Sequence, residues 1–372
     1  MKIITFFNHK GGVAKTTNCF NLAWKLAEKG NRVVMVDADS QCNLTGLSMG
    51  LMPADFSAGE VEELADEEVE AASAEFEKTQ VRASEFWQTV SERNIHNALR
   101  PAFFSEPKPL EAVDCIPIER CPGLFLLPGS LNFADYESDL SLAQSLRGVF
   151  GSQRNLPGAI HALLKLTAEK MEADYVIVDV SPSLGAINQN IVTISDEVII
   201  PCAPDYFSVM ALNSLAGVLS KWLQWAREAY ESKELSMAPY PFPKPRLKFA
   251  GVIISRYVVY KKQPAGAFSL WIKKVAETCQ NDLVPGLREY GLTYSDSEYR
   301  DSFGRDDYVA ALIREFNSLR PRSQENQIPV FALEREHLRG IGGQSLYNTE
   351  IQIKDLDNQY ERFADSIIAL TD

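Results

Sequence analysis

The chain opens with MKIITFFNHKGGVAKTT, residues 1–17, and this stretch decides what the rest of the chain can be. The apolar segment Lys2 to Phe7 has the composition of a short buried strand. Two glycines follow it, and then a helix that we expect to start at Lys15. A strand that runs through a glycine turn into a helix directs several successive backbone N–H groups at one point. The sequence therefore predicts an anion-binding site at residues 10–17.

The turn departs from the common phosphate loop in two places. That loop reads G-x-x-x-x-G-K-[ST], whereas His9 and Ala14 occupy the two glycine positions here. The stretch does satisfy K-G-G-x-x-K-[ST], with an additional lysine, Lys10, five residues before Lys15. In this it resembles the deviant Walker A class of P-loop ATPases, the ParA/MinD family. The alternative is a chance glycine turn between a strand and a helix.

The resemblance assigns roles to these residues and implies ATP and Mg²⁺ as cofactors. Lys15 would grip the phosphates of its own nucleotide, while Lys10 would reach across a dimer interface to the partner's nucleotide. Such a second cation stabilises the charge that develops on the leaving group during phosphoryl transfer. Thr16 would hold Mg²⁺, and Thr17 would bond a phosphate oxygen. The expected nucleotide-binding residues are Lys10, Gly11, Gly12, Val13, Ala14, Lys15, Thr16 and Thr17.

A second strand, Arg32 to Val36, ends in the carboxylates Asp37 and Asp39. Its continuous apolar run indicates a parallel strand buried on both faces. A strand–helix–strand unit places such carboxylates beside the first loop, where an open parallel sheet binds ligands. The D-x-D-x-Q run resembles the second signature of the ParA/MinD family, which implies that Asp39 orients the attacking water and Asp37 supports the metal. The alternative is that both aspartates cap the following segment.

A third strand, Tyr175 to Val178, leads into Asp179. A rigid, dry support for one carboxylate is what a magnesium ligand of the Walker B type needs. The following residues, 180–185, resemble the family's switch segment, which senses the γ-phosphate. An aspartate at a strand end is often only a turn residue, so this assignment depends on the match of residues 10–17.

These motifs predict an α/β fold: a doubly wound, mostly parallel, twisted sheet flanked by helices, as in P-loop NTPases, with helical insertions. With 372 residues and 45% hydrophobic content, the chain can bury a large core. We expect a single P-loop ATPase domain over residues 1–372. The resemblance fades around residues 50–122 and 281–327, which we interpret as an acidic helical insertion and a second insertion.

Hydrophobic patterns outside the motifs predict further elements. We expect a strand at 124–127, a buried strand at 197–201, a long helix from about 206 to 229 and an extended proline-rich linker at 239–245. We expect a strand at 248–254, a helix stopped near Pro101, a helix from Tyr308 to Leu319, a last core strand at 328–333 and a closing helix at 356–370. The base-binding loop of the family should lie nearby, but residues 334–344 do not match it.

The composition of the chain predicts its cellular compartment and the state of its cysteines. No apolar run approaches the ~20 residues that cross a bilayer, and no signal peptide precedes the first strand, so we expect a cytoplasmic protein without membrane contact. The six cysteines contain no C-x-x-C pair, which indicates free thiols and argues against a bridging metal cluster.

The net charge of −13 is unevenly distributed. Residues 55–77 contain ten acids and no Lys or Arg. We expect this block to form one or two helices, which could be a DNA-mimicking or partner-binding surface or simply a solvated helix face. Its candidate core-facing positions are Phe56, Val61, Leu64, Val69, Phe76 and Val81.

Residues 235–276 reverse the balance, with eight basic residues and no acid. Basic side chains interleaved with aromatic ones could contact phosphates of DNA without reading its sequence. An exposed basic face that only keeps the protein soluble is the alternative. The expected DNA-binding residues are Arg256, Lys261, Lys262, Lys273 and Lys274.

Three functions fit these observations. The first is a ParA-like ATPase in plasmid or chromosome partitioning, whose ATP-bound sandwich homodimer binds DNA non-specifically on the nucleoid and hydrolyses ATP slowly under a ParB-like or adaptor partner. The second is a MinD-type positioning ATPase, which the acid-rich residues 355–372 disfavour because that type uses a basic amphipathic C-terminal helix. The third is a nucleotide-clamped interaction scaffold in another system, such as defence or conjugation.

Overall fold

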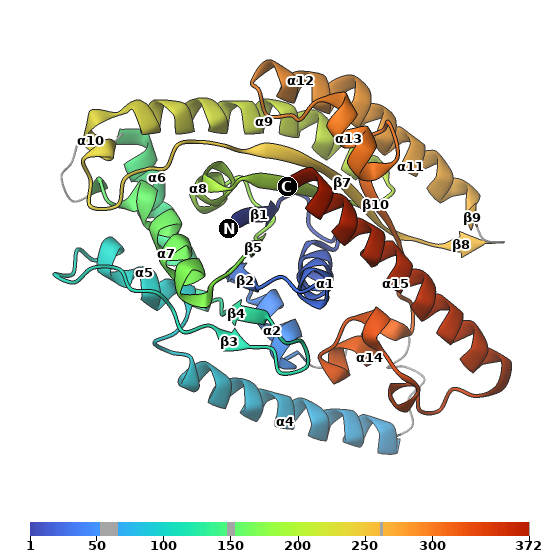
Figure 1. Ribbon diagram of the computed structural model, residues 1–372. Coiled ribbons are helices and arrows are strands. Elements are labelled where there is room, and N and C mark those ends of the chain that lie inside the picture. The colour runs from blue at the N-terminus through green and yellow to red at the C-terminus, as the bar shows by residue number, and fades with distance from the viewer. Residues whose placement is uncertain (53–65, 147–152, 261–262, 372) are drawn as a thin grey trace.

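The protein is built on one twisted eight-stranded sheet, seen in the computed structural model of Figure 1, which describes residues 1–52, 66–146, 153–260 and 263–371. The strands follow the order β10-β7-β6-β1-β5-β2-β4-β3 across the sheet. Their bounds are β1 Lys2–Phe6, β2 Val33–Ala38, β3 Ile116–Pro117, β4 Leu124–Leu127, β5 Tyr175–Val180, β6 Glu197–Cys202, β7 Lys248–Tyr257 and β10 Val309–Arg314. The predicted doubly wound α/β fold is confirmed.

The sheet is parallel except at one edge, where β3 pairs antiparallel with β4. Every residue of β2, β5 and β6 is buried. Such burial requires helices on both faces, and it explains why these strands read as continuous apolar runs in the sequence. Because the strands are parallel, the residues that follow β1, β2, β5, β6, β7 and β10 meet at the same edge of the sheet.

Helices cover both faces. The main helices are α1 Lys15–Glu28, α2 Asn43–Met49, α4 Asp66–Thr89, α5 Ile95–Phe103, α6 Tyr136–Leu146, α7 Leu156–Met171, α8 Ala186–Ile194, α9 Tyr206–Glu231, α10 Lys233–Ser236, α11 Gly266–Thr278, α12 Val284–Glu289, α13 Asp296–Phe303, α14 Leu319–Asn326 and α15 Gly343–Thr371. Shorter helical turns are η1 Leu131–Asp135, η3 Cys279–Leu283, η4 Val330–Ala332 and η5 Arg335–His337. A small hairpin pairs β8 Val259–Tyr260 with β9 Gln263–Pro264.

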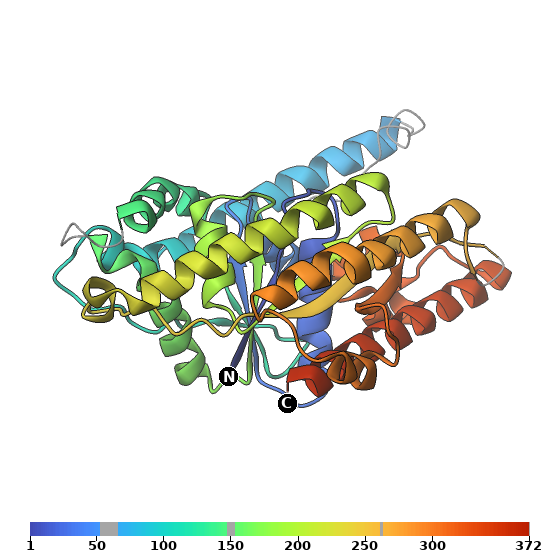
Figure 2. The same cartoon turned by 90° about the horizontal axis from the view of Figure 1, so that it is seen from above.

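The N- and C-termini lie on the same side of the molecule, as Figure 2 shows from above. The C-terminal helix α15 packs on α1 and on the edge strand β10, while α9 packs on α8, α11 and α12. None of the described helices has the length and apolar character needed to cross a lipid bilayer. All six cysteines are buried free thiols, as expected.

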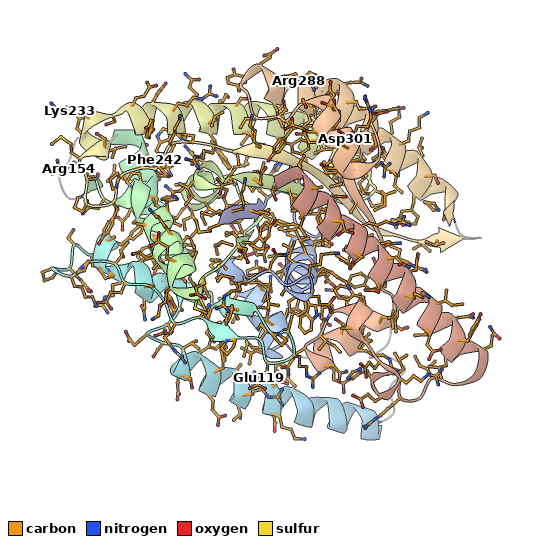
Figure 3. The ribbon with its side chains drawn as sticks, viewed as in Figure 1. Glu119, Arg154, Lys233, Phe242, Arg288 and Asp301 are labelled. Carbon is orange, nitrogen blue, oxygen red and sulfur yellow. The ribbon has the colours of Figure 1, made fainter. Side chains whose placement is uncertain are left out.

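The proline-rich linker at 239–245 contains no helix or strand, as predicted. It holds Phe242, labelled in Figure 3, whose buried ring lies edge-on against Trp225 of α9 at a centroid distance of 5.2 Å. The linker therefore packs on the body of the protein.

Two secondary-structure predictions were wrong. Residues 309–314 of the expected helix from Tyr308 to Leu319 form the edge strand β10, and residues 330–332 of the expected last strand form only a 3-10 turn. The helix expected to stop near Pro101 does so, because α5 ends at Phe103, two residues after this proline. The expected second insertion, 281–327, thus contains a strand of the main sheet. Short apolar runs do not distinguish a strand from a helix turn, and here pairing with β7 decided the outcome.

The acidic insertion forms a long helix, α4, near the β3 edge of the sheet (Figure 1). Two of the expected core-facing positions are wrong, because Phe76 and Val81 are 46% and 59% exposed. Phe56, Val61 and Leu64 lie outside the described residues, and the side chain of Val69 is not described. The sequence pattern therefore identified the helix but not its buried face.

A buried hydrogen-bond chain joins α15 to α1 and β7. The Tyr360 hydroxyl donates to Asn18 Oδ1 at 2.8 Å, and Asn18 Nδ2 donates to Ser255 Oγ at 2.9 Å. All three residues are buried. Helix α15 is therefore coupled directly to the helix that follows the glycine loop.

We expect Tyr360→Phe to lower the free energy of unfolding by about 1–3 kcal/mol, because it leaves the buried Asn18 oxygen without its donor. Urea denaturation measures the change. Tyr347→Phe is the matched control on the same helix, since Tyr347 is 59% exposed, and it should leave stability unchanged. Equal stability of Tyr360→Phe and wild type would contradict a structural role for this bond.

Candidate functional site

The glycine loop has the backbone that an anion site requires. Gly12 and Ala14 both lie in the left-handed region, with φ of 73° and 61°. Glycine adopts this region freely, whereas an alanine there is strained by about 1–2 kcal/mol. Ala14 immediately precedes α1, whose start has no side-chain cap hydrogen bond. The first N–H groups of α1 therefore point at the loop without a capping side chain, and they suit an anion.

Asn8 anchors the loop to the sheet. Its Nδ2 donates to the Pro201 carbonyl at 2.8 Å, and its Oδ1 accepts from the Lys10 backbone N–H at 3.0 Å. Asn8 is fully buried. The loop is thus connected to the end of β6 as well as to β1. Sequence reasoning missed Asn8, although an asparagine directly after an apolar strand was a usable signal.

A cavity of about 440 Å³ lies over the loop at the carboxyl edge of the sheet. Seven of the eight expected nucleotide-binding residues, Gly11 to Thr17, line it, together with Asp39 and Pro182 of the switch segment. Further lining residues come from the ends of β7 and β10 and from α14: Ser255, Arg256, Arg314, Glu315, Phe316, Arg320, Ser323 and Gln324. The cavity is therefore long enough to extend well beyond the phosphate loop.

Lys15 is the buried cation of this site. Its side chain is only 7% exposed, and its Nζ donates to the Lys10 carbonyl at 3.2 Å. Burial lowers the pKa of Lys15, and the charges of Asp179 and Asp39 oppose that effect. The structure thus brings together Lys15, Asp39 and Asp179, which the sequence predicted as site residues from three separate segments.

Asp179 is the second-last residue of β5, and its buried carboxyl group makes no hydrogen bonds within the part of the chain that the structure describes. Neither of its oxygens has a hydrogen-bond partner among the described residues. Burial, reinforced by the charge of Asp37, raises the pKa of Asp179 to about 8, against the opposing effects of Thr16 and Lys15. The Thr16 hydroxyl is thus close to Asp179 but makes no hydrogen bond of normal geometry with it. A buried polar group without partners indicates a site that a ligand completes.

Asp37 has a different environment. Its Oδ2 accepts hydrogen bonds from the backbone N–H and the hydroxyl of Thr45, both at 2.7 Å, and its Oδ1 accepts from the Asp39 N–H at 3.3 Å. Burial raises its pKa to about 6, and these bonds oppose the rise. In this geometry Asp37 caps the start of α2 and positions the Asp39 backbone. Its predicted supporting role near the metal stays a prediction.

Lys10 does not line the cavity. Its Nζ lies 2.6 Å from Asp205 Oδ1 and 3.2 Å from Ser208 Oγ, at the start of α9. Asp205 also caps α9 by accepting from the Ser208 N–H at 2.8 Å. The additional lysine of the motif is therefore held within its own chain. Its predicted reach into a partner's site requires this ion pair to open.

The basic block divides in space. Arg256 lies in the cavity wall, where its guanidinium donates to the Gly12 carbonyl at 3.1 Å. Lys273 and Lys274 lie on α11, are 74% and 53% exposed, and both pair with Glu277. Lys261 and Lys262 lie outside the described residues. The predicted DNA-binding set thus combined a residue of the cavity, Arg256, with residues of an exposed surface, Lys273 and Lys274.

The far end of the cavity was missed by sequence reasoning. Its residues lie at the end of β10, in the segment expected to be helical, and on α14, and neither segment carried a nucleotide signature. Two side-chain atoms at this end, Arg314 Nε and Gln324 Oε1, are buried without a hydrogen-bond partner among the described residues, as is Asn21 Oδ1 of α1. All three residues line the cavity. They provide a donor and two acceptors for a polar ligand.

A family model described as an AAA domain matches residues 1–229, which is more than half of the chain. The chain belongs to the ParA/MinD family of ATPases. The chromosome partitioning protein ParA of Caulobacter vibrioides is 25% identical over 258 residues, which is 69% of this chain and 70% of that one. The sporulation initiation inhibitor protein Soj of Bacillus subtilis is 28% identical, over 58% of this chain and 63% of that protein.

Solved structures show the same fold. Protein DIP2308 of Corynebacterium diphtheriae superposes with a TM-score of 0.57 and 22% identity, over 88% of this chain and 97% of that one. Apo McdA of Cyanothece has a TM-score of 0.56 and 15% identity, over 98% and 99% of the two chains. The shared fold therefore extends over nearly the whole chain, including the part beyond the family-model match.

We expect Asp179→Asn to raise the free energy of unfolding of the ligand-free protein at pH 7 by about 1–3 kcal/mol. The native carboxyl keeps its proton up to a pKa of about 8, whereas the unfolded chain loses it near 3.8. The unfolded state then binds fewer protons, so burial of Asp179 lowers the stability as pH rises from about 4 to about 8. The stability difference between variant and wild type should widen over this range and level off above it, as measured by urea denaturation at several pH values.

Glu197→Gln is the matched control at the opposite edge of the sheet. Burial raises the pKa of Glu197 to about 8 as well, despite the hydrogen bond it accepts from Tyr294. This variant should show the same widening difference, which establishes that the method detects a buried carboxyl. A constant difference for Asp179→Asn between pH 5 and 8 would contradict the raised pKa of Asp179.

Proposed function

We propose that this protein is a ParA-like ATPase that binds ATP with Mg²⁺, forms a nucleotide-sandwich homodimer, binds DNA non-specifically and hydrolyses ATP slowly under the control of a partner protein. One observation carries the proposal: the residues of the glycine loop, the buried Lys15 and Asp39 line one cavity, and the buried Asp179 lies close enough to Lys15 to affect its pKa. Phosphoryl transfer depends on positioning and on charge stabilisation of this kind.

The residues present fit a magnesium ion. Asp179 offers two oxygens without hydrogen-bond partners, and the Thr16 hydroxyl lies beside it. Among the described residues no group of three or more His, Cys, Asp or Glu side chains could hold a metal, but Mg²⁺ at nucleotide sites takes few protein ligands and completes its shell with phosphate oxygens and water. When bound, the ion would neutralise negative charge on the phosphates. Thr16 and Asp179 would hold it, and Asp37 would support them.

The chain's own groups suit the steps of hydrolysis. The loop N–H groups and Lys15 would bind the phosphates and stabilise the charge that develops on their oxygens. Asp39 would orient the attacking water, because its carboxylate lines the cavity and is held by the Gln41 N–H at 3.0 Å. Hydrolysis would be slow while Lys10 is paired with Asp205, since the second cation is then absent from the site.

An exposed apolar surface supports the dimer. Tyr206, Phe207 and Met210 at the start of α9 are 54%, 69% and 49% exposed, and Leu184 of the switch segment is 49% exposed. The Lys10 ammonium lies 5.8 Å from the centre of the Phe207 ring. Exposed apolar side chains gathered beside a site indicate a protein interface. A second copy that covered them would bring Lys10 of each chain near the partner's cavity.

The proposed role in partitioning draws on the relatives, two of which are named for chromosome partitioning and for inhibition of sporulation. Of the five expected DNA-binding residues, Lys273 and Lys274 lie on the exposed surface of α11, Arg256 lines the cavity, and Lys261 and Lys262 lie outside the described residues. The pairing of Lys273 and Lys274 with Glu277 reduces but does not cancel the positive charge of α11. A ParB-like or adaptor protein would be the activating partner.

We expect Lys15→Ala and Asp39→Ala to separate binding from hydrolysis. Lys15→Ala should lose ATP affinity by about 100-fold or more, because it removes the buried charge that faces the phosphates. Asp39→Ala should bind ATP and dimerise but hydrolyse it about 100-fold more slowly, because only water positioning is lost. Calorimetry, light scattering and phosphate release measure the three properties. Normal turnover by Asp39→Ala would contradict the assignment of the water-positioning residue.

We expect ATP-dependent retention on DNA to fall when Lys273 and Lys274 are both replaced by Glu, with the steepest loss at low salt, because binding to phosphates releases counterions. Nucleotide affinity should stay as in the wild type, since neither lysine lines the cavity. Retention that is independent of ATP, or unchanged in this variant, would contradict a nucleotide-switched DNA surface on α11.

A further inference from the structure

Strand β7 contains an extra residue where it reaches the cavity. Ser255 pairs with Ile313 of β10 and Tyr257 pairs with Arg314, so that Arg256 between them has no partner across the ladder. The backbone of Arg256 lies in the left-handed region, with φ of 70°. Bulges beside active sites commonly redirect a side chain. A non-glycine residue in this region costs about 1–3 kcal/mol and is typical of functional sites.

The bulge directs the Arg256 side chain toward the glycine loop. Its NH1 donates to the Gly12 carbonyl at 3.1 Å, and its Nε lies 3.2 Å from Glu315 Oε2. Glu315 is itself held, because its N–H donates to the Tyr257 carbonyl at 2.9 Å and its carbonyl accepts from Gln352 of α15 at 3.4 Å. The guanidinium is therefore positioned by the loop on one side and by the segment after β10 on the other.

Packing does not explain this conformation. The Arg256 side chain is 48% exposed, so little burial offsets the backbone strain. It lines the same cavity as Thr16 and Thr17. The two contacts use two of the five N–H donors of a guanidinium. The arrangement thus presents a charged planar group at the edge of the anion site, in the geometry that arginine uses to bind phosphate oxygens.

We propose that Arg256 is a phosphate-binding residue of the nucleotide site within its own chain, rather than part of the DNA surface to which its place in the basic block assigned it. The inference rests on the proposed function, in that a nucleotide occupies this cavity. It goes beyond that function by adding a third cation, besides Lys15 and the partner's Lys10. The contact with Gly12 places this cation beside the loop and not at the far end of the cavity.

The test compares Arg256→Gln with wild type in calorimetric binding of ATP with Mg²⁺ and of adenosine. We expect ATP affinity to fall about tenfold, as for loss of one charge-assisted hydrogen bond, and adenosine affinity to stay unchanged. Arg256→Lys should recover part of the ATP affinity, because lysine restores the positive charge but not the planar set of N–H donors of a guanidinium group. The melting temperature of each ligand-free variant is measured in parallel.

Arg300→Gln is the matched control. Arg300 is 59% exposed, pairs with one carboxylate, Asp306, and does not line the cavity. It should bind ATP and adenosine as the wild type does. A lower ATP affinity in this control would show that loss of any half-exposed arginine has the same effect, and would overturn the inference.

Three other results would overturn the inference. Arg256→Gln could bind ATP like wild type but lose DNA retention, which would assign Arg256 to the DNA surface. ATP and adenosine affinities could fall equally together with the melting temperature, which would make Arg256 a structural brace. Wild-type protein that binds no ATP would overturn the proposed function itself, and this outcome is distinguished from the others because it is seen before any variant is measured.

Discussion

The site depends on one interaction, that of the buried Lys15 side chain with the nearby carboxyl groups of Asp179 and Asp39, which oppose the effect of burial on the pKa of Lys15. A lysine at 7% exposure is costly unless carboxylates lie near it. Those carboxylates come from β2 and β5, and they meet Lys15 only because β1, β2 and β5 are adjacent, parallel and in register. The order of strands in the sheet is thus a condition for a stable cation beneath the anion site.

Two buried aspartates on neighbouring strands differ in their hydrogen bonds, and this difference indicates a structural role for one and a ligand-binding role for the other. Asp37 and Asp179 lie at paired positions of β2 and β5. Asp37 is satisfied by Thr45, so its charge supports the fold, while Asp179 has no such donor among the described residues. A carboxylate left without donors costs stability in the ligand-free protein. That cost is consistent with a residue kept for a bound cation.

Two residues beside the cavity have strained backbone conformations. Ala14 and Arg256 both adopt left-handed backbone conformations, one at the start of α1 and one at the end of β7. Neither conformation follows from local preference, because both residues favour negative φ. The hydrogen bond from Arg256 to Gly12 joins the two segments. Strain at both places is therefore supported by the surrounding sheet and not by the segments themselves.

The local sequence predicted the parts of the fold that have a strong pattern. The strands around residues 33, 176 and 198 were found because full burial makes them continuously apolar, and α1 was found because its loop has a specific string of residues. The strand β10 was missed, since a short run of six largely apolar residues does not distinguish a strand from a helix turn. The exposed positions of α4 were missed because periodicity does not show which face packs.

By itself, the sequence determined the phosphate loop, its lysines and threonines, and the three carboxylates at strand ends, because each is a local string directly after an apolar strand. The tertiary structure alone decided that Lys10 pairs with Asp205, that Asp37 is satisfied while Asp179 is not, and that Arg256 joins the cavity. Those outcomes depend on contacts between residues up to 244 positions apart. No local pattern encodes such contacts, since they arise only when the strands assemble in their final order.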